Sequence, residues 1–428
     1  MAKERLRVLF CDHLNLARGK MLPGTFGDGG ESRFCQGIYA LTYDKDLIPV
    51  PCSTLLEGLP DMIARFDGDD IRSGWLGNEK VVIADQFASD GSPLPVCGRS
   101  LLKRTANDWR QEGYNTKVGI ELEAYAFVQD DSGQWVPYDT PGSFVYSTGP
   151  LTDPIGFTDA IWEQADACGF DLEMLTSEFD SPQFEFTLRF DDAVKAVDDI
   201  FLFRLMAREM AIEHGVLLTF MPKPIEELSG SGVHINFSLW DDKHTNRIGD
   251  AEADDNLSDL GRACVAGLMH HHQGLAGLLA PTVNSYVRLQ PASLSGYWRN
   301  WGIDHRGVTT RITTETGSHA RVEHRMADGA ANPYTVTAAV LQAALLGHKN
   351  GYELAPAETA DCLENHDAKD GVAADLGSAL DALEADEALV NAVGEDLVGN
   401  LVGIKREEIE KTAELSNIQQ RDYYLHYI

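Results

Sequence analysis

Two glutamates, Glu121 and Glu123, stand two residues apart in the apolar segment 119–127, which reads GIELEAYAF. Their alternation with Ile, Leu and aromatic residues predicts a β-strand. Because strand side chains repeat every two residues, both carboxylates should point to the same face of a sheet. Like charges so close together repel each other, and burial makes that repulsion costlier. We therefore expect that face to be open to water or to hold a positive charge.

More candidate ligands lie in three other segments that resemble strands. They are Glu178 and Glu185 in SEFDSPQFEFTLRF, His234 in GSGVHINFSLWD, and Glu323 in RVEHRMADGAANPY. A single glutamate in a strand is usually solvated, so the inference depends on the whole set of five carboxylates and one imidazole. An oxygen-rich set with one imidazole suits Mg²⁺ or Mn²⁺. A divalent cation would offset the repulsion between Glu121 and Glu123.

The elements that must position these residues form an α+β pattern. Short strand patterns, among them 37–43 (GIYALTY), fill the first hundred residues, and a helical pattern follows at 99–112. Beyond it, strands alternate with long helical patterns, which lie at 157–168, 191–214, 256–279, 334–350 and 376–428. The pattern predicts a small N-terminal domain over residues 1–98 and a larger domain over residues 99–428.

Charge and composition exclude several classes of function. The chain has 428 residues and a formal net charge of −32, so its surface should repel the phosphates of nucleic acid. We find no run of about 18 apolar residues and no signal-peptide pattern, and we expect no membrane span. Seven scattered cysteines without a CxxC pair favour reduced thiols, and we expect a cytoplasmic protein.

The segments quoted above, together with NSYVRLQP and the following WG and HRGVTTRI, resemble the glutamine synthetase family in order and internal spacing. The similarity runs from about residue 99 to the end of the chain and is weaker before it. This resemblance implies a β-grasp-like N-terminal domain and a catalytic domain built on an antiparallel half-barrel flanked by helices. It also implies a homo-oligomeric ring, commonly a dodecamer.

The resemblance assigns roles to individual residues. Glu123, Glu178 and Glu185 match the ligands of a first divalent ion, Mg²⁺ or Mn²⁺, and Glu121, His234 and Glu323 match those of a second. Three arginines match residues that contact the phosphates of ATP during phosphoryl transfer: Arg306, Arg311 and Arg321. Phe190, Asn236 and Ser238 match nucleotide-side positions, and Gly230, Arg288 and Arg325 match positions that bind glutamate.

The chain departs from the family at a flap that shields the acyl phosphate from water. Ammonia-using members read RLxPGxEAP there, and the glutamate helps to bind ammonium and to accept its proton. The segment here is RLQPASLSG, which places Leu294 at the position of that glutamate. Loss of the carboxylate should weaken binding of a small hydrated cation and leave room for an apolar group.

The departure predicts an organic amine as the acceptor, such as an alkylamine, ethanolamine or a polyamine, joined to the γ-carboxylate of glutamate. Two alternatives stay open. One is an ordinary ammonia-using glutamine synthetase in which another group takes the proton. The other is a non-catalytic relative that serves as a scaffold or a sensor.

Overall fold

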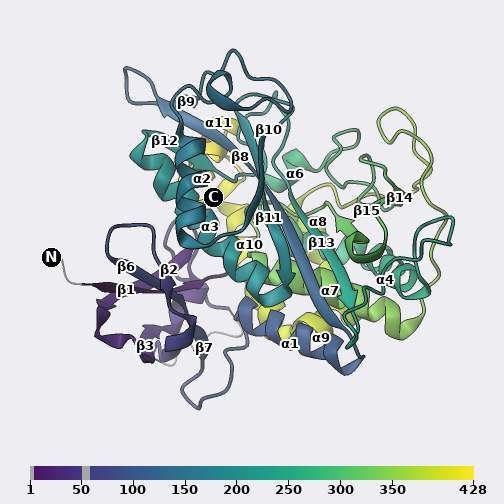
Figure 1. Cartoon of the computed structure of the whole chain (residues 1–428), viewed down its shortest axis with the longest axis horizontal. Helices are drawn as coiled ribbons and strands as arrows, with labels where there is room; N and C mark the ends of the chain where they lie inside the picture. Colours follow the sequence, from purple (N-terminus) through teal and green to yellow (C-terminus); the bar gives the residue numbers. More distant parts are fainter. Residues whose placement is uncertain (1–3, 51–57) are drawn as a thin grey trace.

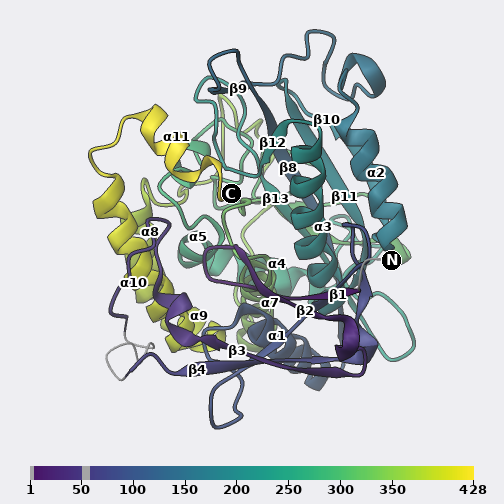
Figure 2. The same ribbon diagram turned by 90° about the vertical axis from the view of Figure 1, so that its left-hand side faces the viewer.

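The computed structural model describes residues 4–50 and 58–428, so Cys52 lies outside the described residues. The N-terminal part holds two small sheets, which form the purple region of Figures 1 and 2. One has the order β2-β1-β6-β5 and pairs β1 with β6 in parallel, and the other has the order β3-β4-β7. Their strands are β1 (Arg5–Cys11), β2 (Ala17–Pro23), β3 (Gly29–Cys35), β4 (Asp61–Asp67), β5 (Arg72–Ser73), β6 (Glu79–Ile83) and β7 (Asp85–Phe87).

The strand expected at 37–43 is wrong, because residues Gln36–Ala40 form a 3₁₀ helix. Tyr39 and Ala40 are adjacent in the chain, and both are buried. A strand that covers the core with one face turns neighbouring side chains to opposite sides, so it could not bury both of them there.

The large sheet has nine strands and carries the predicted site. Its main path is β10-β11-β8-β13-β16-β15-β14, and β9 and β12 also pair with β8. The bounds are β8 (Asn115–Gln129), β9 (Trp135–Pro137), β10 (Leu172–Ser177), β11 (Gln183–Asp192), β12 (Val216–Thr219), β13 (Val233–Trp240), β14 (Trp301–Ile303), β15 (Thr310–Ile312) and β16 (Val322–His324). Neighbours are antiparallel except β14 and β15. Within the described residues β10 does not pair with β14, so the sheet stays open and the predicted half-barrel is confirmed.

The described part of the chain holds eleven α-helices. They are α1 (Gly98–Gln111), α2 (Phe157–Cys168), α3 (Ala193–Glu213), α4 (Asp259–His270), α5 (His272–Leu279), α6 (Ser285–Arg288), α7 (Pro333–Asn350), α8 (Leu376–Ala385), α9 (Glu387–Val393), α10 (Glu395–Thr412) and α11 (Asn417–Leu425). No described helix is both long and apolar enough to cross a membrane.

The single helix predicted over 256–279 is wrong, since α4 and α5 are separate helices that meet at His271. The buried Nδ1 of His271 lies 2.7 Å from the Oδ2 atom of Asp386. Next to it, a side chain at Gly274 would meet Asp386 at 2.8 Å. This contact with the start of α9 fixes the break, and helical periodicity alone does not reveal such a long-range contact.

The α3 helix covers one face of the large sheet and packs against β8, β11 and β12, as Figure 1 shows. Along β8 the buried residues Val118, Ile120, Leu122 and Ala124 join the main hydrophobic core. The residues between them face the opposite side, where Glu121 and Glu123 are only half-buried. The predicted alternation is thus present, and it leaves one face of β8 available for chemistry.

Candidate active site

The register of four neighbouring strands brings predicted ligands together. Glu121 on β8 is paired with His234 on β13, and Glu123 is paired with Glu185 on β11. On the next strand, β16, Glu323 is paired with Asn236. Directly opposite residues in antiparallel strands have β-carbons about 5 Å apart, so the pairing alone places these side chains within reach of one another.

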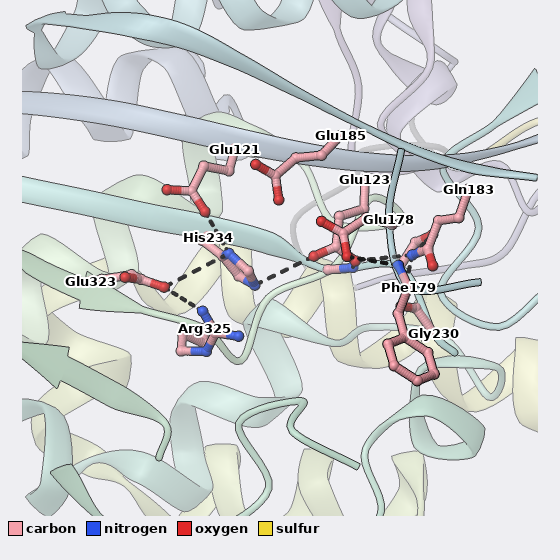
Figure 3. A network of polar contacts seen from close by, with 12 residues as sticks. Glu121, Glu123, Glu178, Phe179, Gln183, Glu185, Gly230, His234, Glu323 and Arg325 are labelled. Atoms are coloured by element: carbon pink, nitrogen blue, oxygen red, sulfur yellow. Dashed lines mark hydrogen bonds and ion pairs between the residues drawn. The ribbon is translucent and has the colours of Figure 1, made fainter. Parts of the chain in front are cut away.

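The six predicted ligands form two groups, as Figure 3 shows. In each group the ligand atoms lie within 4.8 Å of one another, and the groups consist of Glu123, Glu178 and Glu185, and of Glu121, His234 and Glu323. His234 lies between them, with Nδ1 2.7 Å from Glu121 and Nε2 3.6 Å from Glu123. These groups have the same members as the two ligand sets that the sequence resemblance implied.

The electrostatics of the first group favour a bound cation. Burial and the charges of Glu121, Glu123 and Glu178 together raise the pKa of Glu185 to about 9. Burial and the charge of Glu123 also raise the pKa of Glu178. Three carboxylates that resist joint ionisation, with hard oxygen atoms this close together, fit a divalent cation such as Mg²⁺ or Mn²⁺.

The second group is partly neutralised by its neighbours. Burial opposes the ionisation of Glu121, but hydrogen bonds with His234 and Asn236 outweigh it and lower its pKa to about 2. Glu323 is buried between two guanidinium groups, with Nη1 of Arg311 2.9 Å from one carboxylate oxygen and Arg325 bonded to the other. Oxygen ligands and one imidazole suit Mg²⁺ or Mn²⁺ here too.

Arg311 and Arg325 also have unused donors at this site. The Nε atoms of both guanidinium groups are buried, and no described residue accepts a hydrogen bond from them. A buried donor without a partner is costly unless a ligand satisfies it. Phosphate and carboxylate oxygens are the groups that a guanidinium binds best.

Arg288 is buried beside a glycine-rich turn. Its guanidinium donates to the carbonyl oxygens of Met326 at 2.8 Å and Arg325 at 3.1 Å. A β-carbon on Gly230 or on Gly232 would lie 2.6 Å from the Arg288 side chain. Glycine at both positions is therefore required for this placement of Arg288.

Two predicted residues stay apart from this cluster. Arg306 is exposed, and within the described chain it has no hydrogen bond or ion pair. Leu294 lies on the loop between α6 and β14, is 45% exposed, and has a positive φ of 54°. The predicted flap position of Leu294 thus lies in an exposed loop.

A cavity of about 380 Å³ extends from Glu121 along β8 and β13. The predicted nucleotide-side residues Phe190, Asn236 and Ser238 all line it, and so does Arg321. The Nε atom of Arg321 donates to the Oδ1 atom of Asn236 at 3.1 Å, and its guanidinium pairs with Glu315. The cavity thus extends from the second carboxylate group along a wall of aromatic and polar side chains.

A β-bulge directs Phe190 into this cavity. The register between β11 and β8 shifts between Leu188 and Asp191, so one extra residue lies on β11. Bulges of this kind re-aim side chains. A β-carbon on Gly119 would lie 3.2 Å from the β-carbon of Phe190, so Gly119 leaves the space that Phe190 occupies.

Sequence reasoning missed Gly119, Lys117 and Gln183. Gly119 and Lys117 continue the two-residue period of Glu123 and Glu121 toward the start of β8, so the signal was present. Gln183 donates its Nε2 to Glu123 at 3.2 Å and to the carbonyl oxygen of Gly230 at 3.1 Å. No local pattern identified Gln183, because these contacts depend on strand pairing.

Comparisons with known proteins agree with this arrangement. The model of the glutamine synthetase catalytic domain matches residues 95–424. Glutamine synthetase of Halobacterium salinarum is 30% identical, with 98% of this chain and 93% of that protein covered. Glutamine synthetase of Pyrococcus abyssi is 31% identical, with 96% and 91% covered.

Solved structures agree as well. A crystal structure of a novel glutamine synthase homolog superposes with a TM-score of 0.87 at 24% identity, and the two chains are covered to 100% and 99%. Ligand-free GmaS and a GmaS/ADP complex each give a TM-score of 0.83 at 26% identity, with 98% of this chain and 96% of GmaS covered. The chain therefore belongs to the glutamine synthetase family of ATP-dependent carbon–nitrogen ligases.

Proposed function

We propose that this protein joins the γ-carboxylate of glutamate to a small organic amine at the expense of ATP. The observation that carries this proposal is Leu294, which stands where ammonia-using members of the family have a glutamate. The two carboxylate groups and the neighbouring cavity support a working ligase rather than a scaffold, because uncompensated carboxylates only cost stability.

Each part of the site has a chemical task in this proposal. Two divalent ions, Mg²⁺ or Mn²⁺, would be held by the two groups of ligands and would supply charge neutralisation for the ATP phosphates. Phe190, Asn236 and Ser238 would bind the nucleotide. Arg306, Arg311 and Arg321 would contact its phosphates, although Arg306 must turn inward to do so. Arg288, Arg325 and Gly230 would hold glutamate.

The reaction proceeds in two steps. An oxygen of the glutamate γ-carboxylate attacks the terminal phosphorus of ATP, the bond to the bridging oxygen breaks, and ADP leaves. The amine nitrogen then attacks the acyl carbon, phosphate leaves with the bonding electrons, and the nitrogen loses a proton. The Nε–H groups of Arg311 and Arg325 have no acceptor in the described part of the chain, so they would be available to the negative charge that develops in the reaction.

The flap selects the amine in this proposal. Neutral groups make hydrogen bonds in this loop: the backbone N–H of Gln290 donates to the hydroxyl oxygen of Ser293, and the hydroxyl groups of Ser293 and Ser295 bond to each other. Leu294 adds an apolar side chain to these neutral groups. Ammonium loses its full hydration on binding, and a neutral pocket does not compensate for that loss. An alkylamine can bury its carbon atoms against Leu294, which recovers about 0.8 kcal/mol for each buried CH₂ group.

We also propose the two-domain division at residues 1–98 and 99–428, and a homo-oligomeric ring, commonly a dodecamer in this family. The start of α1 at Gly98 agrees with that division. Sedimentation of the purified protein measures the size of the ring.

The test of the proposed function is ADP release with glutamate and a panel of amines, in Mg²⁺ and in Mn²⁺. The panel contains ammonia, methylamine, ethylamine, ethanolamine and putrescine. We expect an organic amine to give the highest kcat/KM. The curated relatives above are glutamine synthetases, so ammonia is the serious competitor. The highest kcat/KM with ammonia would refute the organic amine, and no turnover with any amine would indicate a scaffold.

A further inference from the structure

The cavity beside the carboxylates has a second charged end. Lys117 and Glu121 are four residues apart on β8, face the same side, and both line this cavity. A strand advances about 3.4 Å per residue, so the two positions are separated by about 14 Å. Lys117 is paired with Ser238 on β13, two residues beyond Asn236. The cavity thus runs from the carboxylate group at Glu121 to an ammonium group at Lys117.

The surroundings of Lys117 are aromatic and suit the nucleoside part of a nucleotide. Its Nζ atom lies 5.9 Å from the ring centroid of Phe190 and 5.6 Å from that of Trp240. The indole nitrogen of Trp240 donates to the hydroxyl oxygen of Ser238 at 2.9 Å, which fixes both side chains. An ammonium group can only donate hydrogen bonds, so its partner in the cavity must be an acceptor.

A simpler role for Lys117 is an ion pair with Asp192, which faces it on β11. Nζ lies 3.9 Å from Oδ1 of Asp192, whose side chain is 72% exposed. A pair so long and so open to water contributes little stability. This pair therefore does not account for a half-buried lysine at the end of a cavity.

We propose that Lys117 is a nucleoside-binding residue that donates a hydrogen bond to an acceptor on the base or ribose of the bound nucleotide. The proposal rests on the proposed function, because it takes the nucleotide to lie with its phosphates toward Glu121. The distance along β8 places Lys117 at the far end from those phosphates. Lys117 therefore discriminates a nucleotide from a bare polyphosphate.

The test compares two ligands that share phosphates but differ in the nucleoside. Equilibrium binding of ADP and of inorganic tripolyphosphate is measured by calorimetry with Mn²⁺ present, for the wild type, Lys117→Met and Asp192→Asn. Loss of one hydrogen bond from a charged donor should weaken ADP binding about tenfold or more in Lys117→Met. Tripolyphosphate binding should stay within about twofold. Asp192→Asn should bind both ligands like the wild type.

A second readout separates binding from a general loss of structure. Lys117→Met should raise the KM for ATP about tenfold and leave kcat nearly unchanged, with a melting temperature close to that of the wild type. Should Lys117→Met not fold, Lys117→Leu replaces it, because leucine also removes the donor and the charge.

Three results would overturn the proposal. They are unchanged ADP binding in the lysine variant, equal losses for ADP and tripolyphosphate, and an equal loss in Asp192→Asn. Equal losses for the two ligands would place Lys117 on the phosphates. Failure of the wild type to bind ADP would overturn the proposed function itself, and that outcome is distinct from a failure confined to the Lys117 variants.

Discussion

The Glu185→Gln substitution should stabilise the metal-free protein and destabilise the protein that holds a divalent cation. The variant keeps the shape of the side chain and removes one of three carboxylates whose ligand atoms lie within 4.8 Å of one another. Without metal, the wild type must either accept this repulsion or bind a proton against its ordinary pKa. We therefore expect the metal-free variant to be the more stable protein.

The expected magnitude follows from the geometry. At 4.8 Å and an effective dielectric constant near 20, one pair of unit charges costs roughly 3 to 4 kcal/mol. All three side chains are only half-buried, so water and salt reduce that value. We expect the metal-free variant to gain about 1–3 kcal/mol in free energy of unfolding. With Mn²⁺ at about 100 times its dissociation constant, the wild type should gain about 2.7 kcal/mol per site.

The assay is chemical denaturation of the wild type and Glu185→Gln, each with chelator and with saturating Mn²⁺. Glu163→Gln, which removes an exposed glutamate on α2, is the matched control and should change stability in neither condition. Glu185→Gln should be more stable than the wild type in chelator and less stable than the wild type in Mn²⁺. The reasoning fails if Glu185→Gln is already destabilised in chelator, or if Mn²⁺ stabilises it as much as the wild type.

Three further predictions concern other parts of the molecule. Burial raises the pKa of Asp328 to about 6, against the opposing charge of Arg288. The Asp328 carboxyl group therefore stabilises the fold below its ordinary pKa near 4, and this contribution is lost as the pH rises through 6. Asp328→Asn should therefore gain roughly 2–3 kcal/mol of stability relative to the wild type between pH 4 and pH 7, and denaturation across that range measures it; a constant difference would contradict the sign. Leu294→Glu should raise kcat/KM for ammonia about 10- to 100-fold and lower it for alkylamines, since a charged hydrogen bond is gained, and an unchanged ratio in the ADP-release assay would remove the flap from amine selection. Gly119→Ala should displace Phe190 and weaken ADP binding in calorimetry with little change in melting temperature, whereas wild-type affinity would show that Phe190 can move without loss.

The sequence was sufficient to predict features that depend on local pattern. The alternation around Glu121 and Glu123 predicted a strand with one chemical face, and the helical pattern at 157–168 matches α2 residue for residue. Such features arise from side-chain periodicity within one element, which is visible in the chain itself. The grouping of the six ligands came from the family resemblance, since the residues alone do not reveal which strands pair.

Features that depend on distant contacts could not be predicted. The break between α4 and α5 depends on Asp386, more than 100 residues away. The position of Phe190 depends on a bulge in β11, which is not visible before β8 and β11 are paired. Gln183 can be recognised as a site residue only when the folded chain brings the turn at Gly230 beside it. Long-range pairing supplies the geometry in all three cases.

The register of β8 links the hydrophobic core to the chemistry of the site. Val118, Ile120, Leu122 and Ala124 are buried on one face, while Glu121 and Glu123 occupy the other. A shift of one residue would bury the carboxylates and expose the apolar side chains. Full burial of a large aliphatic side chain contributes about 1.5–3 kcal/mol, so the core resists such a shift strongly. The packing against α3 therefore holds the repelling carboxylates on one face of the sheet, which the carboxylates could not achieve by their own interactions.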